Sequence, residues 1–250
     1  MSMTSTPLWT ICHAGLKYPL LTTCVVGGYL YVVQPSPVVA ITFDDGRKSV
    51  YTLALPYMES KDMVGTVYIN NTTIGQESHM TVEDLNKFVS NGWEVGSHGY
   101  DHSDMTTLDR VILNDSFVNS IAGINSMIGK EPTSVASPFG NFNDTVIAVI
   151  DDHFSYHVNA WSEANGINTS ENFNPLNFHR LDTANVTAEY VCEVVENLNN
   201  GEVFSIIFHE ITDVEGKWNI TYSEFKSIID CIEDSGVDVK TVTEAARTLE

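Results

Sequence analysis

The sequence predicts an α/β protein whose parallel strands close into a barrel similar to a TIM barrel. Three observations predict this fold: strands and helices alternate along the chain, the strongest strands are apolar on both faces, and seven or eight such units are present. With 250 residues, 43% of them hydrophobic, the chain is long enough for one large domain. In such barrels the carboxyl ends of the strands form the active face, and several polar clusters of this chain follow predicted strands.

The first half of the chain is expected to form, in order, a strand at 38–41, a helix at 50–57, a strand at 64–69, a helix at 81–89, a strand at 93–96, a helix at 113–128 and strands at 134–136 and 156–161. The second half is expected to form a polar loop at 165–177, a strand at 178–181, a helix at 191–198, a strand at 202–208, a helix from 221 and a strand at 237–242. The strands are runs of apolar and β-branched residues, and the helices are stripes of apolar residues at helical spacing. Gly129 and Gly201 follow two such stripes and suit helix ends, while Thr221 and Glu224 have the spacing of a capping box.

The domain proper is expected to span residues 38–250, preceded by an N-terminal hydrophobic segment and linker at 1–37. Tyr18 to Val33 is an uncharged run of 16 residues, shorter than the ~18 apolar residues that indicate a membrane span. It is either a signal or anchor segment, or a buried hairpin. The first interpretation predicts an extracellular or membrane-anchored protein, attached to a membrane only through this segment; the alternative is a cytoplasmic protein.

The composition is acidic, with 12 basic and 33 acidic residues and a formal charge of −21. This charge argues against nucleic acid or anionic lipid as a partner and favours a neutral or cationic substrate, although a solvated acidic surface explains it better than any charge-specific function. The four cysteines show no C-x-x-C spacing, and Cys192 and Cys231 are expected to be core residues of helices. Seven N-x-S/T sequons would suit a glycosylated surface protein.

Asp44 and Asp45 end the first apolar strand, an unusual place for two adjacent charges. Adjacent residues of a strand point to opposite faces, so the two carboxylates are expected to have different roles. A polar turn before a helix would explain the pair if it stood alone. Other polar residues at strand ends favour a functional site.

His98 and His102 are four residues apart, a spacing that allows both imidazoles to face one divalent metal ion. Asp45, at the end of another strand, is the candidate third ligand, which leaves positions open for water and substrate. A polar loop is the alternative interpretation of the two histidines. The expected ion is Zn²⁺, with Co²⁺, Mn²⁺ or Ni²⁺ as alternatives.

His209 follows the apolar strand at 202–208 directly. It is either a core histidine bonded to a backbone carbonyl or a general acid whose surroundings set its pKa near the working pH. The segment 137–140 is expected to shape one wall of a groove, and Trp161 is expected to contact the substrate or to lie in the core.

At these residues the chain resembles the polysaccharide deacetylase family, which contains the NodB homology domain and is of the carbohydrate esterase type. The matching stretches are Thr42-Phe43-Asp44-Asp45-Gly46 for the first motif, His98-Gly99-Tyr100-Asp101-His102 for the second, Pro138-Phe139-Gly140 for the third and Ile207-Phe208-His209 for the fifth. The resemblance implies a deformed (β/α)7 barrel and runs from about Val38 to the C-terminus. It also implies that Asp44 is the catalytic base, that His209 is the acid, that Asp45, His98 and His102 bind the metal, and that Pro138, Phe139, Gly140, Trp161 and Ile207 contact the substrate.

The chain departs from the family's pattern in two places. Where the third motif commonly opens with an Arg that orients the catalytic Asp, this chain has Ala136, and we expect Arg47 to orient Asp44 instead. The fourth motif's Asp, which tunes the catalytic His, has no clear counterpart, because Asn159 near Trp161 cannot carry the charge. The candidates for this second role are Asp151, Asp152 and Glu210.

The function implied is a metal-dependent hydrolase that removes N- or O-acetyl groups from the sugars of a polysaccharide or oligosaccharide, acting on carbon–nitrogen bonds other than peptide bonds in the first case. One alternative is a metal-independent hydrolase of cyclic amides or imides on the same fold, against which Asp45, His98 and His102 argue. The other is a non-catalytic carbohydrate-binding protein, against which Asp44 and His209 argue.

Overall fold

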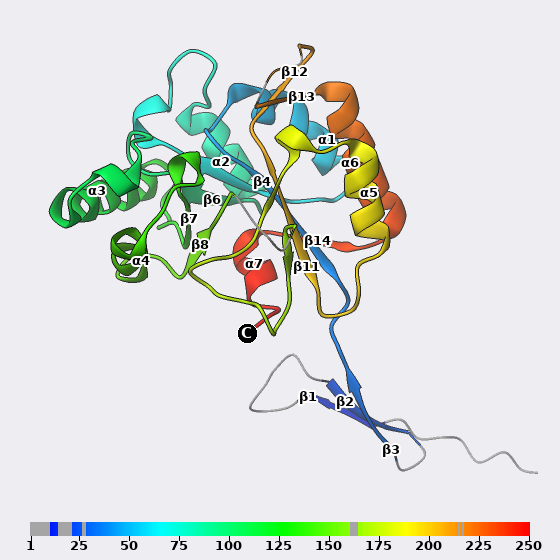
Figure 1. Cartoon of the computed structure of the whole chain (residues 1–250). Coiled ribbons are helices and arrows are strands. Elements are labelled where there is room, and N and C mark those ends of the chain that lie inside the picture. Colours follow the sequence, from blue (N-terminus) through cyan, green and yellow to red (C-terminus); the bar gives the residue numbers. More distant parts are fainter. Residues whose placement is uncertain (1–10, 15–21, 27–28, 161–164, 215, 217) are drawn as a thin grey trace, which may run out of the picture.

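The computed structural model describes residues 11–14, 22–26, 29–160, 165–214, 216 and 218–250, and its centre is a curled parallel sheet (Figure 1). In spatial order its strands are β10 (Leu181–Asp182), β11 (Val203–Phe208), β4 (Val38–Phe43), β5 (Thr66–Ile69), β6 (Glu94–Ser97), β7 (Ser134–Ala136) and β8 (Tyr156–Val158). Phe178 forms a parallel bridge with Val158 of β8, and three residues later Leu181 pairs with Ile206 of β11. The segment 178–182 therefore joins the two edges of the sheet, which completes the predicted deformed (β/α)7 barrel.

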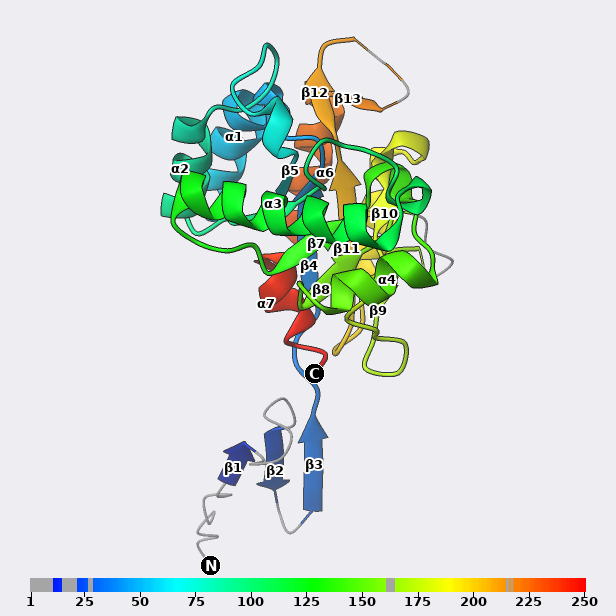
Figure 2. The same cartoon turned by 90° about the vertical axis from the view of Figure 1, so that its left-hand side faces the viewer.

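Two more strands pair with the wall of the barrel. β14 (Asp238–Lys240) runs parallel to the first half of β4, and β9 (Ile167–Asn168) runs antiparallel to β11. Beyond the carboxyl end of β11, β12 (Glu210–Thr212) and β13 (Asn219–Thr221) form a parallel two-stranded ribbon that projects from the barrel (Figures 1 and 2).

Helices surround the sheet (Figure 2). They are a π-helical turn at Val50–Ala54, α1 (Leu55–Glu59), α2 (Val82–Ser90), α3 (Arg110–Ile128), α4 (Asp144–Asp151), α5 (Ala188–Glu196), α6 (Tyr222–Ser235) and α7 (Val242–Ala246), with short 3-10 turns at Asn71–Thr73, Met105–Thr107, Pro138–Gly140 and Thr183–Asn185. Thr221 and Glu224 form the predicted capping box of α6, and Gly129 ends α3 with a φ of 71°.

The alternation of side chains along β4 divides the core into two layers. Val39, Ile41 and Phe43 point outward and pack in the layer shared with the surrounding helices. Val38 and Ala40 point into the barrel, where they share a smaller core with α7. The backbone N–H of Thr243 on α7 donates to Glu94, the first residue of β6, so α7 closes the amino end of the barrel. The candidate active site therefore lies at the other end of the barrel, where the parallel strands have their carboxyl ends.

Three expected elements differ from the structure. The expected strand 237–242 is shorter, because Thr241 caps α7, and the expected polar loop 165–177 contains β9. β8 ends at Val158, and Trp161 lies outside the described residues. α4, an eight-residue helix that begins after Asn143, was not expected, because residues 146–150 are all apolar and show no clear helical period.

The N-terminal region contains a three-stranded antiparallel sheet of β1 (Ile11–Ala14), β2 (Thr22–Val26) and β3 (Tyr29–Val33), which lies apart from the barrel in both views (Figures 1 and 2). The uncharged run 18–33 thus includes two paired strands. Among the described residues, no helix has the length and apolar character needed to cross a membrane.

The expectation that Cys192 and Cys231 are merely core residues is wrong. They form a disulfide between α5 and α6, with their Cα atoms 5.8 Å apart. The two helices pack side by side on the outside of the barrel, so the bond joins neighbours in space that are 39 residues apart in sequence (Figure 1).

Candidate active site

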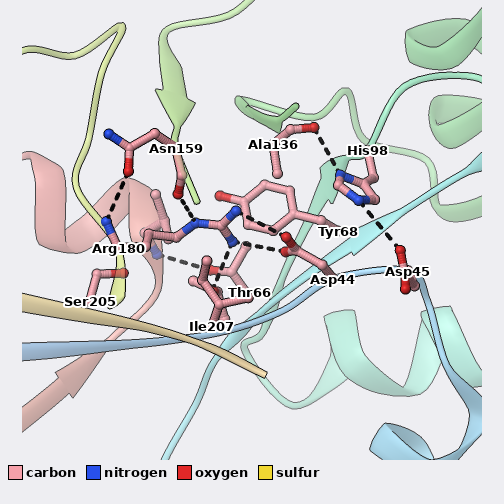
Figure 3. Close-up of polar contacts among 12 residues, drawn as sticks. Asp44, Asp45, Thr66, Tyr68, His98, Ala136, Asn159, Arg180, Ser205 and Ile207 are labelled. Atoms are coloured by element: carbon pink, nitrogen blue, oxygen red, sulfur yellow. Dashed lines mark hydrogen bonds and ion pairs between the residues drawn. The ribbon is translucent and has the colours of Figure 1, made fainter. Parts of the chain in front are cut away.

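Asp44 extends the inward-pointing series of β4 and is therefore directed into the barrel. Arg180 meets it there: Nη1 donates to Oδ1 at 2.8 Å and Nη2 donates to Oδ2 at 3.0 Å (Figure 3). Both residues are buried, and Arg180 also donates to the Asn159 carbonyl and to the Thr42 hydroxyl. Burial by itself would raise the pKa of Asp44, but the Arg180 guanidinium outweighs it, so the pKa lies below its ordinary value and the carboxylate is ionised at neutral pH.

The residue that holds Asp44 is therefore Arg180, and the expectation for Arg47 is wrong. The Nη2 atom of Arg47 lies 3.4 Å from Oδ2 of Asp45 instead. Arg47 follows the turn at Gly46, outside the barrel interior into which Asp44 points. Arg180 reaches Asp44 from the segment that joins the barrel's edges, and its guanidinium packs 5.3 Å from the ring centroid of Tyr68 (Figure 3).

Asp45 leaves the strand alternation because its backbone is left-handed, with a φ of 70°, and Gly46 follows at 62°. This turn directs Asp45 toward the two histidines. Its Oδ1 lies 3.2 Å from Nε2 of His102 and 3.5 Å from Nε2 of His98. His102 also has a left-handed φ, of 62°, so both sides of the cluster are built on unusual backbone conformations.

The cluster fits a divalent metal ion. One ligand atom from each of Asp45, His98 and His102 lies within 4.8 Å of the others. Nδ1 of His98 donates to the Ala136 carbonyl at 2.9 Å, which leaves the Nε2 lone pair directed at Asp45 (Figure 3). Two imidazoles and one carboxylate form the donor set of many catalytic zinc sites, with room for further ligands.

His209 and Asp182 line the same cavity as this cluster. His209 follows β11, and Asp182, at the end of the neighbouring β10, is 8% exposed. Burial raises the pKa of Asp182, although the Ala184 N–H donates to its carboxylate and the charge of His209 acts in the opposite direction. None of the residues expected to tune His209 has this position: Asp151 and Asp152 are exposed on α4 and at its end, and Glu210 begins the ribbon.

A cavity of about 280 Å³ connects these groups. Six of its lining residues are aspartates or histidines: Asp44, Asp45, His98, His102, Asp182 and His209. Two aromatic rings flank it, with the ring centroid of Phe139 4.6 Å from that of His102 and the ring centroid of Trp218 5.6 Å from that of His209. Phe139 is 55% exposed and Trp218 is 39% exposed.

Of the expected substrate-contact residues that the structure describes, two line the cavity and two do not. Phe139 and Gly140 line the cavity. Pro138 is buried beside Gly99, and Ile207 is buried in β11, where its carbonyl accepts a hydrogen bond from the Thr183 hydroxyl. Neither Pro138 nor Ile207 is among the residues that line the cavity, so each would influence a substrate only through the residues next to it.

Sequence reasoning missed Arg180 and Asp182, and a signal for Arg180 was present. A charged residue within a short predicted strand needs a partner of opposite charge, because a buried unpaired charge is costly. Arg180 stands in the expected strand 178–181, in a chain with only 12 basic residues. The identity of its partner depends on how the barrel closes, and the strand pattern does not give that.

Comparisons with known proteins identify relatives of this chain. Residues 32–154 match the family model described as polysaccharide deacetylase. A chitin deacetylase of a Pestalotiopsis species is 26% identical over 119 residues, which cover 48% of this chain and 39% of that protein. The chain thus spans about two fifths of the length of the first curated relatives that it matches.

Solved structures share the fold. A family 4 acetyl xylan esterase from Clostridium thermocellum, in complex with a cobalt ion, has a TM-score of 0.60 at 20% identity, covering 83% of this chain and 89% of that one. A family 4 pseudoenzyme from Bacillus anthracis has a TM-score of 0.61 at 17% identity, covering 86% of this chain and 70% of that one. The fold therefore occurs both with and without activity, so activity has to be argued from the residues of the site.

Proposed function

Because this chain belongs to the polysaccharide deacetylase family, we propose that it is a metal-dependent hydrolase that removes acetyl groups from the sugars of a polysaccharide. One observation carries the proposal: an ionised carboxylate fixed by Arg180, a cluster of Asp45, His98 and His102, and the imidazole of His209 share one cavity. A base, a metal site and an acid around one small cavity are the groups that acyl hydrolysis requires.

Asp45, His98 and His102 would hold the divalent ion. Bound there, the ion would supply Lewis acidity toward the acetyl carbonyl and would lower the pKa of a water molecule toward ~7. The hydrogen bond from His98 to the Ala136 carbonyl keeps that imidazole in the tautomer that can donate its Nε2 lone pair.

Asp44 is proposed to accept the proton of the attacking water. The two hydrogen bonds from Arg180 fix the plane of its carboxylate, so it is oriented before the substrate arrives. The lowered pKa keeps it ionised, and therefore able to accept a proton, throughout the neutral range.

His209 is proposed to donate a proton to the leaving nitrogen or oxygen of the sugar. Asp182 lies in the same cavity and would stabilise the charged imidazolium, the role for which the sequence offered no clear residue. The aromatic rings of Phe139 and Trp218 flank the opening and would contact neighbouring sugars of the chain, since exposed rings suit the apolar faces of sugar units.

The alternative from another class is a non-catalytic carbohydrate-binding relative, as the pseudoenzyme neighbour illustrates. The pair of Asp44 and Arg180 favours a catalytic protein over a binding protein. A buried carboxylate fixed in the same cavity as a candidate metal site has no evident use in binding a neutral sugar. A metal-independent hydrolase of cyclic amides or imides would not need the cluster of Asp45, His98 and His102.

We also propose that the protein acts outside the cytoplasm. The disulfide between Cys192 and Cys231 supports this location, because disulfides persist in oxidising compartments. Of the seven sequons, those at Asn70 and Asn168 are buried and bonded to backbone carbonyls, so glycans would be limited to the others.

Two measurements on the purified chain test the proposal. The first is the bound metal per chain, before and after chelation. The second is acetate release from a panel of chitin oligomers, peptidoglycan fragments and acetylated xylan, with single sugars as the comparison for polymers. A zinc-loaded protein that binds these glycans without releasing acetate would favour the non-catalytic alternative.

A further inference from the structure

A further histidine, His157 on β8, is not among the residues that line the cavity and takes no part in the chemistry proposed above. It is fully buried, and both its ring nitrogens are engaged. Nδ1 lies 2.8 Å from the Leu176 carbonyl oxygen, and Nε2 lies 2.9 Å from the hydroxyl oxygen of Ser137. Ser137 follows β7 and is one of the residues that line the cavity.

The carbonyl of Leu176 determines the tautomer of His157. A carbonyl oxygen only accepts hydrogen bonds, so Nδ1 must carry the hydrogen. Burial lowers the pKa of His157 to about 4, with Arg180 acting in the same direction, so the ring is neutral at physiological pH. A neutral ring has only one N–H, and Nε2 is therefore a bare acceptor.

The tautomer in turn determines the orientation of the Ser137 hydroxyl. Its single hydrogen is donated to Nε2 of His157, since the other neighbour, the Met105 sulfur at 3.9 Å, is a weak acceptor. The oxygen of Ser137 can then only accept further hydrogen bonds. A hydroxyl that ordinarily rotates to suit its partner has become an acceptor of fixed direction at the wall of the cavity.

We propose that Ser137 accepts a hydrogen bond from the amide N–H of an acetamido sugar, and that the site thereby selects N-acetyl over O-acetyl substrates. The inference rests on the proposed deacetylase function and names the substrate class of the same cavity. An ester oxygen in place of the N–H has no hydrogen to offer. It would place two acceptors against each other, an arrangement that sites built for a donor reject.

The test compares two substrates that differ only at this atom: a chitin oligomer, and an analogue with a 2-O-acetyl group in place of the 2-acetamido group. The measured quantity is the ratio of the two kcat/KM values, which cancels the intrinsic reactivity of esters when variants are compared. In Ser137→Ala the ratio should shift toward the ester by about three- to tenfold, the usual value of one neutral hydrogen bond. Ser205→Ala is the matched control, because Ser205 is also buried and bonded, but to the Ala40 carbonyl within the sheet.

The other possible outcomes of this comparison contradict the proposed role of Ser137. Equal loss on both substrates means that Ser137 supports the wall or accepts from a sugar hydroxyl, and the N–H assignment is wrong. An unchanged ratio in a folded Ser137→Ala protein also overturns it. If that variant does not fold, the wild-type chain decides: a preference for the ester after correction for its reactivity contradicts the inference.

Failure of the proposed function itself is recognised separately. A metal-loaded wild type that releases no acetate from either substrate contradicts the deacetylase assignment. Selectivity is then read from binding, as the ratio of the two Kd values measured by calorimetry for wild type and Ser137→Ala. Tighter binding of the acetamido ligand that is lost in Ser137→Ala supports the role of Ser137 even in a non-catalytic protein, and equal ratios contradict it.

Discussion

Arg180 binds both carboxylate oxygens of Asp44 although 136 residues separate the two in sequence. Both side chains are buried, so the pair lies in a medium of low dielectric where neither charge is tolerated without the other. The proposed base is therefore held by a residue that belongs to the closing segment of the barrel.

Arg180→Lys should lower turnover while the bound metal stays near the wild-type level. A lysine ammonium can neutralise Asp44 but cannot make the two parallel hydrogen bonds that fix its plane. We expect a loss of roughly ten- to a hundredfold in kcat, consistent with misplacement of a catalytic group. Arg47→Lys is the matched control, because Arg47 contacts Asp45 at 3.4 Å and not Asp44. A greater loss in the control than in Arg180→Lys would reverse the assignment.

Asp44→Asn and Asp45→Ala should separate proton transfer from metal binding. Asp45→Ala removes a charged donor from the three-residue cluster, so bound metal and activity should fall together. Asp44→Asn should keep its metal and lose roughly two to four orders of magnitude in turnover. Metal per chain and acetate release are measured on both proteins. Loss of metal in Asp44→Asn with retention in Asp45→Ala would exchange the two roles.

His209→Ala should be sensitive to the leaving group. An acetamido sugar needs a proton on its nitrogen to depart, whereas an aryl acetate releases a stable phenolate without one. We expect turnover of the sugar to fall by roughly 10²-fold or more and that of the aryl ester to change far less. Asp182→Asn should show the same pattern more weakly, because it acts through His209. Equal losses on both substrates would exclude the role of general acid.

His157 should make stability depend on pH. Its pKa in the folded protein is about 4, below the ordinary 6.5, so the unfolded chain binds a proton that the folded chain refuses. The associated stability is complete above pH 6.5 and is lost as the pH falls toward 4, by roughly 3 kcal/mol in all. Urea unfolding of wild type and His157→Gln across this range measures it. The variant should show the flatter profile, and parallel profiles would contradict the assignment.

Replacing both Cys192 and Cys231 with Ala should destabilise the fold without changing the site. The bond closes a segment of 39 residues, for which the chain-entropy model gives about 4 kcal/mol. Thermal unfolding with and without reductant measures the loss, and kcat/KM of the folded double variant is the control. A wild-type Tm that does not change on reduction would show that the cysteines are not joined.

The alternation of apolar strands and amphipathic helices was sufficient to predict the barrel. The central strands β4 and β11 bury both faces, and the runs 38–41 and 202–208 therefore carry a strong local signal. The same logic placed Asp44, Asp45, His98, His102 and His209 near one another, because the carboxyl ends of parallel strands meet at one edge. The ribbon strands β12 and β13 have too few residues to show a period, and the apolar run in α4 is continuous, so these elements were missed.

The partners of these residues were decided by tertiary structure. Arg47 was expected beside Asp44 because it is close in sequence, but the left-handed turn at Asp45 and Gly46 takes it to the other carboxylate. Arg180 reaches Asp44 only because the segment 178–182 bridges β8 and β11, and Cys192 meets Cys231 only because α5 and α6 pack together. The pattern of side chains along one strand or helix records which face is buried. It does not record which distant segment covers that face, since many segments can bury the same apolar area, and only closure of the barrel selects one.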